Sequence, residues 1–198
     1  MFGTNNFKIV TFDQDINRHL TTKCDEVDFE NGGLKKAQDI ILELKKAIAP
    51  LLPAAGLAAP QIGINQRVFI LSWDRSEAHL QGMINPSFTP MGEEKEQGWE
   101  ACFSTILGNV PYLIANVPRH KKIEISYIDE QGQVKHQVYE GFAARVFQHE
   151  YDHLEGIGVI HRSDAEIKSF NTRDDVIDFM TKIKQKDKIN YIEPIILN

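Results

Sequence analysis

The stretch from Phe142 to Leu154, Phe-Ala-Ala-Arg-Val-Phe-Gln-His-Glu-Tyr-Asp-His-Leu, determines how the rest of the sequence is interpreted. Its apolar spacing predicts an amphipathic helix. Gly141 introduces the helix and Gly156 supplies a natural stop. One side of this helix would carry both apolar and chemically reactive residues, namely Phe142, Val146, His149, Glu150 and His153.

Two histidines on this helix have the spacing of metal ligands. His149 and His153 are four residues apart, so their side chains lie on one face with Cβ atoms about 5–6 Å apart. Both imidazoles can then reach the same metal ion. Glu150 follows the first histidine directly and would sit beside the metal, where it could move protons.

A catalytic metal needs three protein ligands and an open position. Cys102 is the best candidate for the third ligand, because it lies between two structured regions where a strand or loop could face the helix. The alternatives are Cys24, in a polar stretch, and three side chains downstream of the helix: Glu155, His161 and Asp164. Cys/His/His ligation suits Fe(II), Zn, Ni or Co.

Further elements are expected on both sides of this helix. A second amphipathic helix should run from Leu34 to Ile48 and end at Pro50 and Pro53. Residues 67–73 and 83–88 read as buried strands, and residues 92–96 as a solvated loop. Alternating runs within 123–139 flank Asp129-Glu130-Gln131-Gly132, which predicts a hairpin.

The C-terminal part carries two capping-box patterns, Ser163 with Glu166 and Thr172 with Asp175, which predict one helix or two short ones. Strands in the middle with helices around them favour an α+β fold. We expect residues 1–198 to form a single catalytic domain, with a helical segment of about 164–198 packed on it.

Composition limits the class of protein. With 198 residues, 42% hydrophobic and 25% charged, the chain can bury a core, and disorder throughout is excluded. The net charge of −6 and the lack of a long basic run argue against nucleic-acid binding. Two cysteines do not make a disulfide framework, and neither a membrane span nor a signal peptide is recognisable. A cytoplasmic protein is the expectation.

Three motifs together resemble the signatures of peptide deformylases, enzymes that remove the formyl group from nascent polypeptides. Residues 148–156 look like the third signature, 56–61 like the first and 100–104 like the second, in the family's order. The chain departs from the usual pattern at Ala54 and Ala101, where the family has glycine, and at Phe103, where it often has leucine.

The resemblance implies a fold with mixed, mainly antiparallel sheets packed around a central metal-binding helix. It implies a metal held by Cys102, His149 and His153, with Fe(II) in the cell and Glu150 as the proton-transferring residue. The side-chain amide of Gln61 and the backbone N–H of Phe103 would stabilise the oxyanion.

The expected substrate is an N-formyl-methionyl peptide. Gly56 would let the substrate backbone approach closely, and Ala55, Phe142 and Val146 would line an apolar pocket for the methionine side chain. Such a substrate makes proximity to the ribosome possible, without direct nucleic-acid binding and without a membrane.

Two alternatives stay open on the sequence. One is a zinc peptidase that uses the same histidine pair with a downstream third ligand. The other, motivated by Ala54 and Ala101, is a relative that binds formyl peptides but turns them over weakly.

Overall fold

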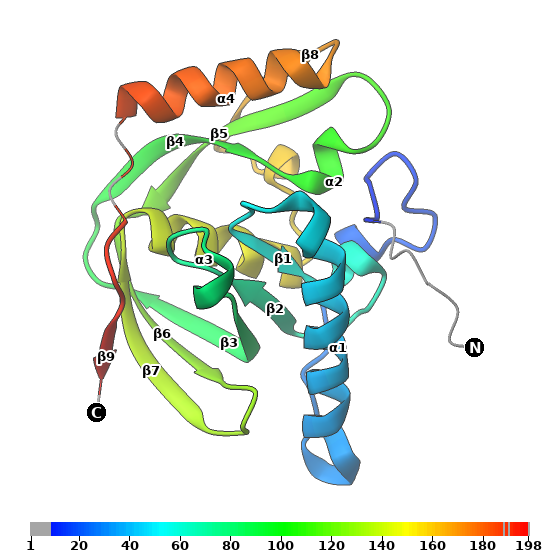
Figure 1. The fold of residues 1–198 in the computed structure, drawn as a ribbon, viewed down its shortest axis with the longest axis vertical. Helices are drawn as coiled ribbons and strands as arrows, with labels where there is room; N and C mark the ends of the chain where they lie inside the picture. The colour runs from blue at the N-terminus through cyan, green and yellow to red at the C-terminus, as the bar shows by residue number, and fades with distance from the viewer. Residues whose placement is uncertain (1–8, 188, 190, 198) are drawn as a thin grey trace.

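The computed structural model describes residues 9–187, 189 and 191–197. Two antiparallel sheets enclose a central helix (Figure 1). The larger sheet has the order β1 (Gly56–Ala58), β2 (Val68–Leu71), β3 (Gln81–Pro90), β6 (Lys122–Ile128), β7 (Val134–Glu140) and β9 (Ile195–Leu197). The smaller sheet has the order β4 (Lys95–Ala101), β5 (Tyr112–His120) and β8 (Glu166–Phe170).

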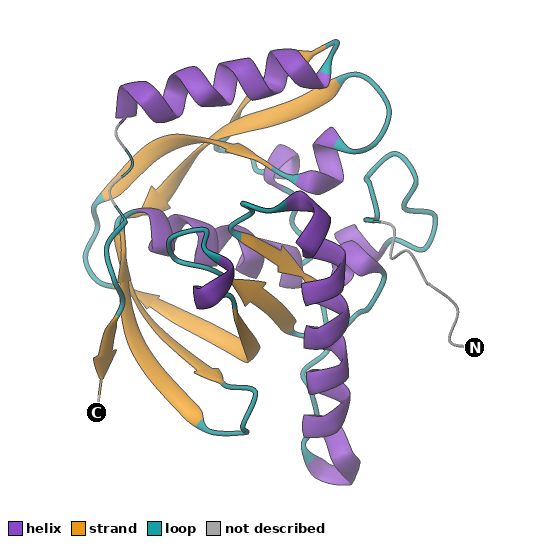
Figure 2. Ribbon diagram, viewed as in Figure 1, coloured by secondary structure: helices purple, strands orange, loops and turns teal. Residues whose placement is uncertain are grey.

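The helices are arranged around these sheets (Figure 2). Their bounds are α1 (Gly33–Ile48), α2 (Phe103–Ile106), α3 (Phe142–Leu154) and α4 (Arg173–Asp187). α1 flanks the large sheet and packs on β1 and β2, whereas α4 lies across β4, β5 and β8. α3 occupies the middle and contacts β1, β2, β5 and β7. The predicted α+β class is confirmed.

The sequence of α3 explains its central place. Ala143, Ala144 and Phe147 are fully buried, and Phe147 makes edge-on ring contacts with Phe69 and Phe88 at centroid distances of 5.3 and 5.9 Å. The helix ends before Gly156, which has a φ of 72° and lies so close to the backbone of residue 22 that a side chain could not fit. The predicted helix is therefore confirmed with its bounds.

Several other predicted elements are confirmed. The helix predicted from Leu34 is α1, and the strands predicted at 67–73 and 83–88 correspond to β2 and β3. The hairpin is β6–β7, with Gly132 in the turn. Thr172 caps α4, because its Oγ1 accepts a hydrogen bond from the Asp175 N–H at 3.1 Å.

Two predictions of local structure were wrong. The capping-box pattern at Ser163 does not start a helix, because Glu166–Phe170 forms β8, which pairs with β5 along Tyr112–Asn116. The loop expected at 92–96 ends early, because β4 begins at Lys95 and pairs with β5. Among the described residues of the segment 164–198, the helix is α4, which lies between the strands β8 and β9 in the sequence.

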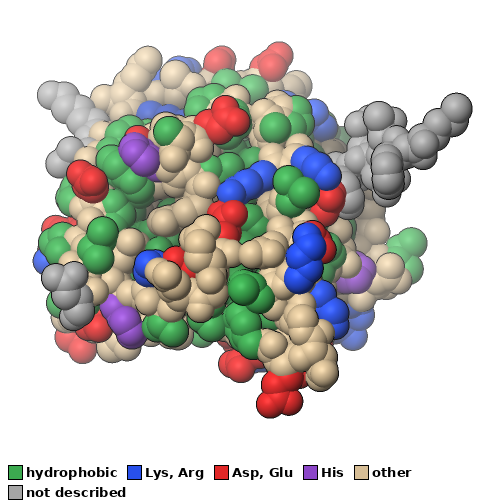
Figure 3. Space-filling view, turned by 60° about the horizontal axis from the view of Figure 1, so that its bottom comes forward, with side chains coloured by type: hydrophobic (Ala, Val, Ile, Leu, Met, Phe, Trp, Pro, Cys, Tyr) green, Lys and Arg blue, Asp and Glu red, His purple; other side chains and the backbone are tan. Residues whose placement is uncertain are grey.

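The surface agrees with the modest acidic net charge. On the face in Figure 3, Lys and Arg side chains lie beside acidic and hydrophobic ones. Among the described residues, no helix combines the length and the apolar character needed to cross a membrane.

Candidate metal centre and active site

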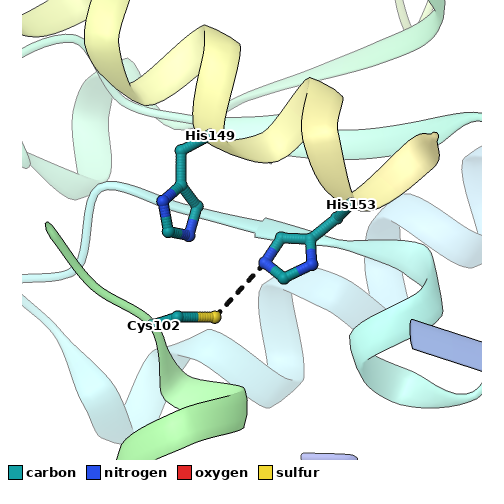
Figure 4. Close-up of side chains that lie close together, drawn as sticks. All are labelled: Cys102, His149 and His153. Carbon is teal, nitrogen blue, oxygen red and sulfur yellow. Dashed lines mark hydrogen bonds between the residues drawn. The ribbon is translucent and has the colours of Figure 1, made fainter. Parts of the chain in front are cut away.

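The three expected ligand residues come together around one point (Figure 4). α3 carries His149 and His153 one turn apart, with ring centroids 5.2 Å from each other. Cys102 follows β4 directly and is the N-terminal cap of α2. Its Sγ lies 3.2 Å from Nε2 of His153, and the ligand atoms of all three residues lie within 4.8 Å of one another. Cys102 and His153 are each about 1% exposed.

The other candidate third ligands are engaged elsewhere. Glu155 forms ion pairs with Arg67 and Lys23, and Asp164 pairs with Arg162. His161 packs edge-on against Phe12. Cys24 lies in a separate apolar cluster, and its backbone N–H donates to the carbonyl of Leu154. Cys102 is therefore the one candidate that joins both histidines.

A carboxylate from β4 orients the first histidine. Nδ1 of His149 donates a hydrogen bond to Oε2 of Glu100 over 2.9 Å, which leaves Nε2 of His149 free to bind a metal. Burial raises the pKa of Glu100, but Arg119 and His149 outweigh this effect and hold that pKa well below its usual range. Glu100 is therefore an anion in a buried position.

Two arginines neutralise that anion. Arg119 makes two hydrogen bonds to Glu100, at 3.0 and 2.9 Å, and Arg145 adds a third at 2.9 Å. Arg119 also pairs with Asp152 of α3, which pairs in turn with Arg162. Arg145 and Asp152, both on α3, thus belong to one network with Glu100 and Arg119.

The chemistry of the three clustered side chains suits a metal cation. Burial lowers the pKa of His149, but hydrogen bonds with Cys102 and Glu100 outweigh it and raise that pKa well above its usual value. Burial and the neighbouring His149 lower the pKa of His153. One sulfur and two ring nitrogens, clustered in a buried place, form the donor set that suits a divalent transition metal.

Glu150 lies beside this cluster. Its side chain is buried, and its Oε2 atom has no hydrogen-bond partner among the described residues. Burial raises the pKa of Glu150 to about 7, so the carboxyl group could both accept and donate a proton near neutral pH. Gly56 of β1 faces it closely, because a Cβ on Gly56 would lie 2.6 Å from Oε1 of Glu150.

The side chain of Gln61 lies next to the sulfur of Cys102. This residue lies in a short 3-10 helix, Ala59–Ile62, where its Oε1 accepts a hydrogen bond from the N–H of Ala58 at 2.9 Å. Its Nε2 donates toward Ser104 Oγ at 3.2 Å and Cys102 Sγ at 3.5 Å. Phe103 begins α2, so its N–H is one of the terminal amides without an intrahelical acceptor.

The residues expected to line the methionine pocket share one apolar cluster. Val146 is buried in that cluster, and Ala55 and Phe142 pack against it. Phe142 also borders a cavity of about 560 Å³ that Ala55 and Val146 do not line.

Sequence reasoning missed how much Glu100 and Arg119 matter to the site. In the sequence, Glu100 stands out only as part of a motif, and Arg119 carries no motif. Nothing local marks their roles, because Glu100 precedes His149 by 49 positions and meets it only after β4 packs against α3.

Comparison with known proteins supports the assignment that the motifs suggested. A family model described as polypeptide deformylase matches residues 7–169. Peptide deformylase 2 of Nostoc sp. is 33% identical over 151 residues, which are 73% of this chain and 78% of that protein. Peptide deformylase 2 of Ralstonia nicotianae is 41% identical over 110 residues, covering 52% of this chain and 59% of that protein.

Solved structures agree. The peptide deformylase of Thermotoga maritima matches with a TM-score of 0.65 and 31% identity, covering 79% of this chain and 96% of that one. A class I type b peptide deformylase from Acinetobacter baumannii, bound to Met-Ala-Ser, matches with a TM-score of 0.63 and 25% identity over 79% and 98% of the chains. The chain belongs to the polypeptide deformylase family, whose members are metal-dependent hydrolases that remove the N-formyl group from nascent peptides.

Proposed function

We propose that this chain hydrolyses the formamide of an N-formyl-methionyl peptide, giving formate and a peptide with a free amino terminus. The observation that carries the proposal is the convergence of Cys102, His149 and His153, with ligand atoms within 4.8 Å of one another, beside the buried Glu150. A formamide is a poor electrophile, so its hydrolysis needs both an activated water and stabilisation of the oxyanion.

Cys102, His149 and His153 would hold one divalent metal ion, which supplies Lewis acidity and lowers the pKa of water when bound. Glu150 accepts the proton of the attacking water and delivers it to the leaving nitrogen as the C–N bond breaks. A carboxyl pKa of about 7 suits both transfers, because neither protonation state is then costly at neutral pH.

Stabilisation of the oxyanion falls to two N–H donors. The Nε2 of Gln61 is already aimed at the sulfur of Cys102, at 3.5 Å, and the N–H of Phe103 follows that residue directly. Because the hydrogen bond from Ala58 to Oε1 fixes which end of the Gln61 amide points inward, the donor is preorganised. Loss of one such donor elsewhere costs about 2.7–4 kcal/mol.

The methionine side chain would enter the apolar cluster at Ala55, Phe142 and Val146. That a relative from Acinetobacter baumannii binds Met-Ala-Ser supports a peptide that begins with methionine as the ligand class. The absence of a side chain at Gly56 leaves room for Glu150 and lets the substrate backbone approach. We assign Fe(II) as the cellular metal because the resemblance to peptide deformylases implies it. Zn, Ni or Co could substitute, because Cys/His/His ligation accepts all of these ions.

A nascent-chain substrate places the enzyme in the cytoplasm near the ribosome. Direct RNA binding is not part of the proposal, because the net charge is −6.

The test combines formate release with metal analysis on one anaerobic preparation. Formyl-Met-Ala-Ser is the substrate, and Glu150→Gln is the matched control because it keeps the shape of the side chain and removes its charge. Formate release by the wild type, with loss of at least about a hundredfold in kcat for a metal-loaded Glu150→Gln, supports the proposal. Peptide binding without formate above that control would instead favour a weak, binding-only relative.

A further inference from the structure

The cavity that Phe142 borders also has Arg145, the ion-pair partner of Glu100, in its lining, so it lies beside the candidate active site. It has a volume of about 560 Å³ and is enclosed by β4, the start of α3, the C-terminal half of α4 and the chain that leads toward β9. One wall is apolar, with Trp99, Phe142, Met180, Ile183, Ile189 and Ile192.

Positive charge predominates in the lining of this cavity. Four cationic and two acidic side chains line it: Arg75, Lys121, Arg145, Lys184, Glu96 and Glu140. Lys121 and Arg145 have carboxylate partners outside the cavity, Glu94 and Glu100. Glu140 is paired with Lys122.

Arg75 and Lys184 differ, because among the side chains that the structure describes no carboxylate forms an ion pair with either residue. Arg75 donates a hydrogen bond to the carbonyl of Pro53 at 3.4 Å and interacts with Tyr191, but both of these partners are neutral and its Nε is buried without an acceptor. Burial lowers the pKa of Arg75 against the opposing effect of a hydrogen bond with Tyr191. Partial burial and the nearby Arg75 lower the pKa of Lys184, whose side chain is still exposed, so two cations stand close together at the mouth of the cavity. An anion between them would relieve both effects.

The position of Arg75 is fixed. It has a φ of 66°, in a turn where Asp74 accepts hydrogen bonds from Ser72 and Ser76 at 3.1 and 2.9 Å. Its guanidinium lies over the ring of Phe142, 4.7 Å from the centroid. The charge is therefore preorganised, which reduces the entropy lost when a ligand binds.

The cavity is within reach of a bound peptide. Phe142 borders it and lies seven residues before His149 on α3, which is roughly 10 Å along the helix axis. An extended peptide advances about 3.3 Å per residue, so a side chain two to four positions from the formylated end spans this distance.

We propose that this cavity is a downstream substrate subsite in which Arg75 and Lys184 bind a carboxylate of the formylated peptide. The inference rests on the proposed function, because it concerns substrates of the same site. The chemistry could be met by an acidic side chain or by the peptide's own C-terminal carboxylate, and the apolar wall would cover the methylene groups beside it.

The test compares kcat/KM for formylated tetrapeptides that carry Glu or Gln at the second, third or fourth position, each with an amidated C-terminus. We expect Glu to be favoured at one position by about threefold to tenfold, and less at high salt. A free-acid version of the Gln peptide shows whether a terminal carboxylate gains the same advantage. Either preference supports the subsite.

Two variants localise the effect. Arg75→Gln and Lys184→Gln should each bring the Glu-to-Gln ratio toward one, whereas Lys46→Gln, on the exposed surface of α1, should keep it. Equal kcat/KM for the Glu and Gln peptides at every position, together with no advantage for the free-acid peptide, would overturn the subsite and leave the proposed function intact. No turnover of any formyl peptide would instead contradict the proposed function. If the Glu-to-Gln ratio of kcat/KM is unchanged in both Arg75→Gln and Lys184→Gln, the subsite is also overturned.

Discussion

The Nδ1 atom of His149 donates a hydrogen bond to Oε2 of Glu100 over 2.9 Å, so a carboxylate from β4 sets the orientation of a ligand residue on α3. The same carboxylate is held by Arg119 and Arg145. The proposed metal centre would therefore depend on groups that do not touch the metal, because they fix the tautomer and the ring angle of His149.

Replacing Glu100 with Gln should weaken metal binding. The amide keeps the shape of the side chain but loses the negative charge that orients His149, and such partners typically account for about tenfold to a hundredfold in metal affinity. Competition with a chelator measures the change. Glu94→Gln is the control, because Glu94 pairs with Lys121 at the surface. Equal metal affinity in the wild type and in Glu100→Gln would contradict this role.

Replacing Arg119 with Met should destabilise the fold. Arg119 is 3% exposed and pairs with both Glu100 and Asp152, so its removal leaves buried carboxylates without compensation. We expect a loss of about 3–5 kcal/mol in the free energy of unfolding, measured by urea denaturation of the metal-free protein. Lys46→Met, which removes an exposed pair with Glu43, should change it only slightly. Similar losses of unfolding free energy in Arg119→Met and Lys46→Met would show that the buried network stabilises the fold no more than an exposed ion pair does.

Replacing Gly56 with Ala should lower kcat while the metal stays bound. The new Cβ would lie 2.6 Å from Oε1 of Glu150, so the carboxyl group must move away from its position beside the ligands. A displacement of about 1 Å in an active site can cost about a hundredfold in rate. Formate release and metal content, measured on the same sample, check this. Full activity at normal metal content would show that Glu150 tolerates the shift.

Raising the pH above 9 should lower the free energy of unfolding because of the buried thiol of Cys24. Burial raises the pKa of this thiol to about 12 from an ordinary value of 9.0. Because the folded pKa exceeds the unfolded one, the stability contributed by the neutral buried thiol is complete below pH 9 and declines as the pH rises toward 12. Between pH 8 and pH 10, the wild type should lose about 1.4 kcal/mol more unfolding free energy than Cys24→Ala. Parallel losses in both proteins would contradict the assignment to Cys24.

Local signals in the sequence were sufficient to predict α3 and its bounds. Its apolar spacing and the flanking Gly141 and Gly156 act within a few residues, and the helix has the predicted bounds. The expected meeting of Cys102 with the histidines came from the matching motifs, because residue types alone had left five candidate third ligands.

The remaining differences arise from contacts between distant segments. Glu166 completes a capping-box pattern that begins at Ser163, but the edge of β5 offers Glu166–Phe170 a row of backbone hydrogen bonds, and this segment becomes β8. Lys95 and Glu96 are polar and exposed, yet they extend β4 because they pair with His120 and Arg119. The pairing of Glu100 with His149 has the same origin, since only the packed fold brings β4 to α3.

The most direct test of the central claim is the metal content of Cys102→Ala beside that of the wild type, with formate release measured on both. We predict one divalent ion per wild-type chain and formate from formyl-Met-Ala-Ser, with both largely lost in a Cys102→Ala protein that still folds. Unchanged metal content in Cys102→Ala would contradict the three-ligand centre and favour a third ligand downstream of α3, as in a zinc peptidase.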